Sequence, residues 1–285
     1  MASINLISNL GEDAKLEEIA SFNHTVAWFL HEAFEKKGVE ARFVKEIDLL
    51  EKSPPEADHS LVISNTAMYF VAGTHKLVRG KTPTIRSKIR KATKEKTNIY
   101  IDSDYPQWIR YFDYVFTVVK PRSTKPKCVY AGWGADPDLF YPEKAEKALF
   151  LDTNPPKPKF QRIYDIYAKV IPSTGMKVYQ ARRPDNLSWA EIREYFRKSH
   201  YYCDTRPGES SLTRIEAAIS GALLVTPKPF YFPRSVGSLE YVLWDTEEEL
   251  IDALNTDTDP QKIREKALEH SWDKVASRII KTLNM

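Results

Sequence analysis

The first part of the chain alternates short apolar runs with a long stretch of helical spacing. The run Ile4 to Ile7 predicts a strand, and the apolar residues that follow recur at helical spacing up to Gly38, where the pattern predicts a helix end. Further strand-like runs occupy residues 41–44, 60–64, 98–102 and 113–118. Strands that alternate with helices predict a parallel sheet covered on both faces. We therefore expect a first α/β domain over residues 1–120.

The second part of the chain repeats this alternation. Strands are predicted at residues 148–152, 177–181, 200–203 and 223–226, and helices at 160–171, 189–198, 212–220, 246–254 and 259–283. The proline-rich and glycine-rich stretch between the two parts predicts a linker over residues 121–143. The expected fold class is α/β, with two Rossmann-like domains that face a cleft, the second of them over residues 144–265.

Composition narrows the class of protein. Of the 285 residues, 42% are hydrophobic and 28% charged, which favours a globular chain with a real core over a disordered one. The two cysteines, Cys128 and Cys203, are too few for a disulfide scaffold, and neither a signal peptide nor a transmembrane run is recognisable. We expect a cytoplasmic protein. Its 10 glycines are about half the usual share of roughly 7%.

The most informative motif joins a strand, a loop and a helix over residues 203–222. Gly208, Ser210, Ser211 and Leu212 would present backbone N–H groups and the positive end of a helix dipole to an anion such as a diphosphate. Glu216 follows in the first turns, where a carboxylate can accept two ribose hydroxyls. Taken alone, the motif also fits a serine that caps a helix and a glutamate on a solvated face.

Three segments of the chain, and their order along it, resemble a known family. Residues 213–226, the segment 130–142 with its Asp136 and Phe140-Tyr141-Pro142, and Ser271 to Ala276 are similar to motifs of retaining nucleotide-sugar glycosyltransferases with the GT-B fold, and in detail to the spore-maturation-protein-like branch. The resemblance spans residues 98–283. It implies a hexosyltransferase-like enzyme that takes a UDP-sugar or similar nucleotide-diphosphate sugar as co-substrate, needs no further cofactor and no metal, and has a C-terminal helix, residues 266–285, that crosses back to the first domain.

The sequence departs from the family's pattern at two places. The family carries two glutamates eight positions apart, but Gly208 stands eight residues before Glu216, so Glu209 is the adjacent candidate for the catalytic position. The loop after the first strand has a single glycine, Gly11, where the family is glycine-rich. We expect that loop to serve the acceptor side through Glu12 and Asp13, together with Asp104.

Cations facing the leaving diphosphate would stabilise the negative charge that develops when the bond to the sugar breaks. The family commonly supplies a basic pair from its second domain. Arg206 and Arg182 are the preferred catalytic candidates because both follow predicted strand ends, and Lys157 is expected to bind the donor. Each of them also fits a solvated surface cation.

A rival chemistry rests on Asp102 and Asp104, which come directly after the apolar run Ile99-Tyr100-Ile101. Two carboxylates at this spacing hold a divalent ion on a nucleotide diphosphate in metal-dependent glycosyltransferases of the other common fold. That alternative leaves the motif at residues 208–221 unexplained. A turn or an interdomain role is the simpler interpretation of the two aspartates.

Charge is distributed unevenly along the chain. The net charge is +3, but residues 79–98 alone carry +7, which leaves −4 for the rest. With Ile85, Ile89 and Ala92 along one edge, this segment predicts a basic amphipathic helix from about Thr84. It could be a solvated face, an anchor on anionic lipid or a contact for DNA. Because of the possible contact with DNA, a DNA-modifying GT-B glycosyltransferase remains an alternative function. Because the first of the family's two glutamates is missing, an inactive GT-B-like binding protein is a further alternative. The acceptor is not identified by the sequence.

Overall fold

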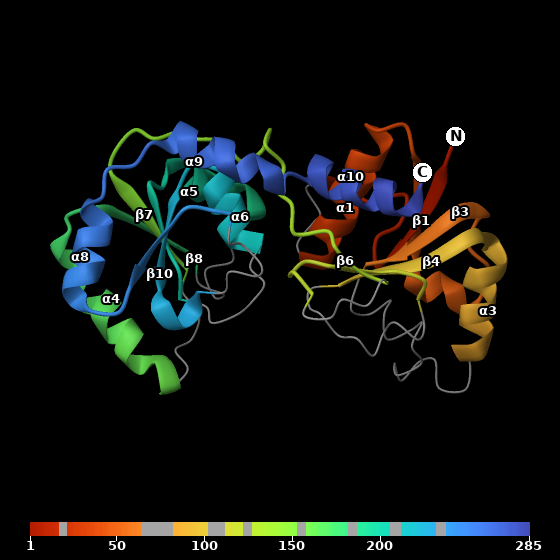
Figure 1. Cartoon of the computed structure of the whole chain (residues 1–285), viewed down its shortest axis with the longest axis horizontal. Helices are drawn as coiled ribbons and strands as arrows, with labels where there is room; N and C mark the ends of the chain where they lie inside the picture. The colour runs from red at the N-terminus through yellow and green to blue at the C-terminus, as the bar shows by residue number, and fades with distance from the viewer. Residues whose placement is uncertain are drawn as a thin grey trace. The chain divides into compact units, whose positions relative to one another are not determined.

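The computed structural model contains two compact units (Figure 1). The first comprises residues 1–132 and 272–285, and the second comprises residues 133–271. The structure describes residues 1–16, 22–63, 82–101, 112–121, 127–152, 158–181, 187–205, 212–231 and 238–285.

The first unit is built on a sheet of six parallel strands in the order β2-β1-β3-β4-β5-β6. All six residues of β1 are buried, as expected for a central strand covered on both faces. The strands are β1 (Ser3–Ser8), β2 (Glu40–Lys45), β3 (Ala57–Val62), β4 (Thr93–Ile101), β5 (Val115–Thr117) and β6 (Cys128–Tyr130).

Helices cover both faces of this sheet. On one face, α1 (Phe22–Glu35) packs beside α10 (Trp272–Leu283), where the rings of Phe29 and Trp272 stack with centroids 6.3 Å apart (Figure 1). On the other face, Ile85 and Ile89 of α3 (Thr82–Ala92) pack into a cluster with β1, β3 and β4. The short helix η2 (Glu46–Leu50) contributes Leu49 to the same cluster. The expected return of the C-terminal helix to the first domain is confirmed.

The second unit is built on five parallel strands in the order β11-β10-β9-β7-β8. The strands are β7 (Ala148–Asp152), β8 (Lys177–Ala181), β9 (Tyr201–Cys203), β10 (Leu223–Pro227) and β11 (Tyr241–Trp244). The helices are η5 (Pro158–Phe160), α4 (Gln161–Ser173), α5 (Trp189–Lys198), α6 (Leu212–Ile219), η7 (Lys228–Phe230), α8 (Glu247–Asn255), α9 (Pro260–Ala267) and η8 (Leu268–His270).

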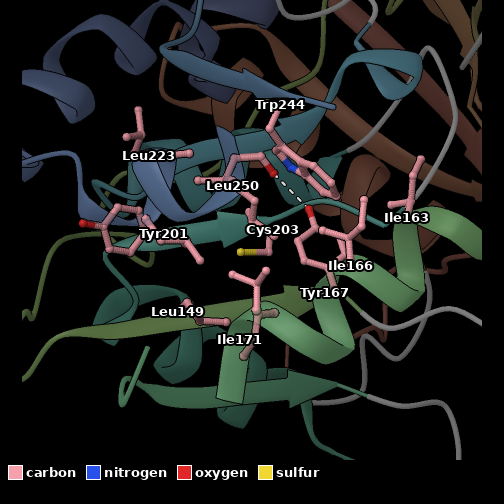
Figure 2. Packing of buried hydrophobic residues seen from close by; sticks show 14 of the residues in the cluster. Leu149, Ile163, Ile166, Tyr167, Ile171, Tyr201, Cys203, Leu223, Trp244 and Leu250 are labelled. Carbon is pink, nitrogen blue, oxygen red and sulfur yellow. Dashed lines mark hydrogen bonds between the residues drawn. The ribbon is translucent and has the colours of Figure 1, made fainter. Parts of the chain in front are cut away.

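Alternate residues along these strands supply two cores. Leu149, Tyr201 and Val225 join the cluster formed with α4 and α8, in which Figure 2 shows Tyr167 beside Trp244. Their neighbours Phe150 and Tyr202 face the other way and pack against Phe196 of α5. This alternation is the period of two that a strand imposes. The predicted α/β class with two parallel sheets is confirmed.

Three local expectations differ from the structure. The expected linker 121–143 divides between the units, because Cys128–Tyr130 forms the edge strand β6 of the first sheet. The strand β11 was not expected. The expected basic helix ends at Ala92, and the chain continues directly into β4, where Thr93 and Thr97 are buried. The helix prediction for the whole basic segment was therefore wrong beyond Ala92, where β-branched residues favour a strand.

Candidate active site

Each sheet has one point at which the chain reverses the direction of strand addition. In the first unit β1 lies between β2 and β3, and in the second β7 lies between β8 and β9. In open parallel sheets, ligands bind beyond the carboxyl ends of the strands at such a switch point. The loops that follow β7 and β9 are therefore the candidate site of the second unit.

The backbone at the end of β9 is held by several hydrogen bonds. The Asp204 amide donates to the Val225 carbonyl at 3.1 Å, and the Tyr167 hydroxyl donates to the Asp204 carbonyl at 3.0 Å. The Tyr164 hydroxyl donates to the Thr205 carbonyl, also at 3.0 Å. Because Tyr164 and Tyr167 lie one turn apart on α4, this helix fixes the point from which the chain enters residues 206–211.

A buried ion pair ties α6 to the same point. The Arg214 Nε donates to Asp204 Oδ2 at 2.7 Å, Nη2 contacts the same oxygen, and Nη2 also donates to the Phe230 carbonyl at 3.2 Å. The side chains of Arg214 and Asp204 are 1% and 0% exposed. Burial disfavours the guanidinium charge, but Asp204, Tyr202 and Tyr241 together outweigh this effect, so the pKa of Arg214 is raised.

The predicted ribose ligand Glu216 lies on α6, which begins at the predicted Leu212. Glu216 is only 5% exposed, so the alternative of a glutamate on a solvated face is wrong. The helix ends at Ile219, and Gly221 follows in the turn with a φ of +77° that suits glycine. The Gly221 and Ala222 amides donate back to the carbonyls of Ala218 and Ala217. Glu216 is thus a buried carboxylate on a short helix with a firm C-terminal end, and its role as a ribose ligand stays a prediction.

Most of the other predicted site residues lie outside the described residues. They are the catalytic candidates Arg206, Arg182 and Glu209, the donor-binding candidates Gly208, Ser210, Ser211 and Lys157, and the aspartates Asp102 and Asp104. Their places in the sequence can still be compared with the sheet. Lys157 follows β7 and Arg206 to Ser211 follow β9, the two strands at the switch point, whereas Arg182 follows the neighbouring β8.

Sequence reasoning missed several polar groups at this edge of the sheet. Asp204 and Arg214 were not singled out, although both belong to the motif. Among the residues that the structure describes, the hydroxyl oxygens of Thr205 and Thr226 are buried without a hydrogen-bond partner. Thr205 lies just after β9, and Thr226 is the next-to-last residue of β10. The two strands are neighbours, since Cys203 pairs with Val225. Buried hydroxyls usually find partners, so this edge offers hydrogen bonds to a ligand.

In the first unit, the acceptor candidates Glu12 and Asp13 line a cavity of about 520 Å³ beside the end of β2. Lys45 lies across from them, with Nζ 3.3 Å from Asp13 Oδ1, and Phe43 and Leu49 add apolar surface. Hydrogen bonding to its own backbone, and then Lys45, lower the pKa of Asp13. Both acidic side chains are exposed.

The cations of the basic segment have several different surroundings. Lys88 Nζ donates to the Leu49 carbonyl at 3.1 Å, and Lys94 Nζ lies 3.9 Å from an Asp58 carboxylate oxygen. Lys96 lies over the ring of Tyr114. Arg90 and Lys91 are exposed at the end of α3. Part of the segment's charge therefore serves the first unit's own structure.

Solved structures with a similar fold were found by comparison with known proteins. No family model and no curated protein matches the chain. Among solved structures, the chain is similar to sucrose-phosphate synthase from Thermosynechococcus elongatus, with 12% identity and a TM-score of 0.55 over 99% of this chain and 98% of that one. It is also similar to a glycosyltransferase from Rickettsia africae ESF-5, with 9% identity and a TM-score of 0.56 over 99% and 98% of the two chains.

A third similar structure is Anabaena HepE in complex with UDP and glucose, with 10% identity and a TM-score of 0.55 over 99% of each chain. The chain therefore has the GT-B fold of these glycosyltransferases, as the motifs predicted. In the parts of the chain that the structure describes, no helix is both long enough and apolar enough to cross a membrane.

Proposed function

We propose that the protein is a GT-B glycosyltransferase that moves a sugar from a nucleotide-diphosphate donor to an acceptor, with retention and without an essential metal. The observation that carries the proposal is the position of the donor motif. Its loop follows a switch-point strand, and its helix α6 holds the buried Glu216. The fold of the similar structures and the UDP and glucose bound to one of them support the same class of donor.

In the proposed reaction, the bond between the sugar C1 and the β-phosphate oxygen breaks, and C1 forms a bond to the acceptor hydroxyl oxygen. The hydroxyl proton leaves with the nucleoside diphosphate. Arg206, Arg182 and Lys157 would stabilise the negative charge on the leaving group, and α6 would bind the diphosphate and, through Glu216, the ribose. Glu209 would face the transferred sugar, and Glu12, Asp13 and Asp104 would face the acceptor.

Turnover without an acceptor tests this proposal, because a glycosyltransferase site transfers sugar slowly to water. The protein is incubated with UDP-glucose, other UDP-sugars, GDP-mannose and ADP-glucose, and the released nucleoside diphosphate is measured. We expect release from one donor class that persists in EDTA. Loss in EDTA and recovery with Mn²⁺ would favour the metal alternative of Asp102 and Asp104. Binding without release would favour the inactive binding protein, and no binding at all would contradict the proposal.

The acceptor side is proposed to meet an anionic surface through the exposed end of α3. The exposed side chains of Arg90 and Lys91 support this. Sedimentation with phosphatidylserine vesicles should carry down the protein and not the variant Arg90→Gln/Lys91→Gln. Binding to duplex DNA that weakens steeply with salt, with no binding to vesicles, would instead support the DNA-modifying alternative.

A further inference from the structure

The Asp204–Arg214 ion pair is an unusual feature in this core. Two charged groups have been taken out of water, although well-packed apolar side chains of similar size stabilise a fold equally well or better. Asp204 directly follows the carboxyl end of β9, and Arg214 lies in the first turn of α6, so the pair is at the edge of the sheet where a ligand would bind. Stability alone therefore does not account for the pair.

The pair joins the two ends of the predicted donor loop. Asp204 precedes residues 206–211, and Arg214 is the third residue of α6, which follows them. The Asp204 backbone is itself fixed by Val225 and Tyr167. Arg214 also donates to the carbonyl of Phe230, a residue of η7, which follows β10. A single guanidinium thus connects α6 with the ends of two neighbouring strands.

The geometry of the helix links this contact to Glu216. Successive helical residues are rotated by about 100°, so Arg214 and Glu216, two positions apart, point in nearly opposite directions. Apolar contacts alone allow a short helix such as α6 to turn slightly about its axis. The directional hydrogen bonds of the Arg214 guanidinium oppose that rotation.

We propose that Arg214, held by Asp204, is a positioning residue that sets the rotation of α6 and thereby aims the Glu216 carboxylate and the first amides of the helix at the donor. The proposal rests on the proposed function, because it assigns the donor to this edge of the sheet. It makes the pair a determinant of donor affinity rather than of folding.

The test separates positioning from stability. In the double variant Asp204→Leu/Arg214→Met, apolar side chains replace both charges, so the chain keeps its free energy of unfolding in urea. We expect its dissociation constant for UDP-glucose, measured by calorimetry, to rise at least tenfold. The amides at the start of α6 should exchange hydrogen at least tenfold faster. Wild-type affinity and wild-type exchange in this stable variant would overturn the proposal.

A second variant covers the case in which the double variant does not fold. Arg214→Lys keeps the charge, but one ammonium group cannot reproduce the guanidinium's contacts with Asp204 and Phe230. We expect a folded protein with a raised KM for the donor and a kcat within about threefold of the wild type. An unchanged KM would contradict the positioning role.

A matched control uses the exposed pair Glu146–Lys177 at the opposite end of the same sheet, where Nζ and Oε1 are 2.6 Å apart. The variant Glu146→Leu/Lys177→Met should change neither donor affinity nor exchange in α6. If the wild type itself binds no nucleotide sugar, the proposed function fails. The exchange of the α6 amides still decides whether the ion pair positions the helix.

Discussion

Gly221 and Pro260 approach so closely that no side chain fits between them. A Cβ at Gly221 would lie 2.6 Å from the Pro260 carbonyl oxygen, and the residue has a φ of +77°. We expect Gly221→Ala to lower the free energy of unfolding by about 3 kcal/mol, from left-handed strain and a backbone clash together. Urea denaturation followed by circular dichroism measures this.

Gly38 provides the control for that prediction. It has a similar φ of +74°, but no atom lies within 4 Å of the position of its Cβ. Gly38→Ala should therefore cost only about 1 kcal/mol. Equal losses in the two variants would show that the contact with Pro260 contributes nothing.

His59 makes stability depend on pH. Burial lowers the pKa of the His59 imidazole, and Lys96 lowers it further. The carboxylates of Glu95 and Asp58 offset this lowering only in part; Glu95 Oε2 lies 3.5 Å from His59 Nε2. The unfolded chain thus binds a proton near pH 6.5, where the folded chain does not, so this contribution to stability is complete above pH 6.5 and is lost as the pH falls toward the lowered pKa.

The variant His59→Gln isolates that contribution. The difference in unfolding free energy between wild type and variant should decrease below pH 6.5, by about 1.4 kcal/mol for each pH unit that separates the two pKa values. Urea titrations between pH 5 and 8 measure it. A difference that is constant over this range would contradict the assignment.

The two cysteines should differ in reactivity. Cys203 is fully buried, and burial raises the pKa of its thiol, whereas Cys128 is half-buried on the edge strand β6. Because the thiolate is the reactive form, the native protein should show one fast thiol toward a disulfide reagent and two after denaturation. Cys128→Ser should abolish the fast reaction; a fast reaction that persists would mean that Cys203 is accessible.

Local pattern predicted much of the fold. The strand Lys177–Ala181 and the helix Trp189–Lys198 have the bounds that the sequence indicated, because apolar periodicity there agrees with the tertiary contacts. The edge strand Cys128–Tyr130 was placed in a linker instead. Its three residues are half-buried and obtain their partners from β5, so the pattern of that segment alone could not assign it.

The site shows the same limit. The motif correctly predicted that α6 begins at Leu212, because this follows from local chain order, while the role of Glu216 as a donor ligand stays a prediction. The sequence did not predict the ion pair between Asp204 and Arg214. Charged residues are usually exposed, and these two are buried only because they contact each other in the folded chain. The hydroxyls of Thr205 and Thr226 were missed for a similar reason, because only the sheet brings them to one edge.

Calorimetry with the variant Glu216→Ala tests the central claim most directly, namely that the second unit binds a nucleotide-diphosphate sugar through α6. UDP and UDP-glucose are titrated into the wild type, into this variant and into Glu194→Ala, which removes a carboxylate from the exposed surface of α5. We predict at least tenfold weaker binding only in Glu216→Ala, with its fold retained by circular dichroism. Wild-type affinity in a folded Glu216→Ala would contradict it.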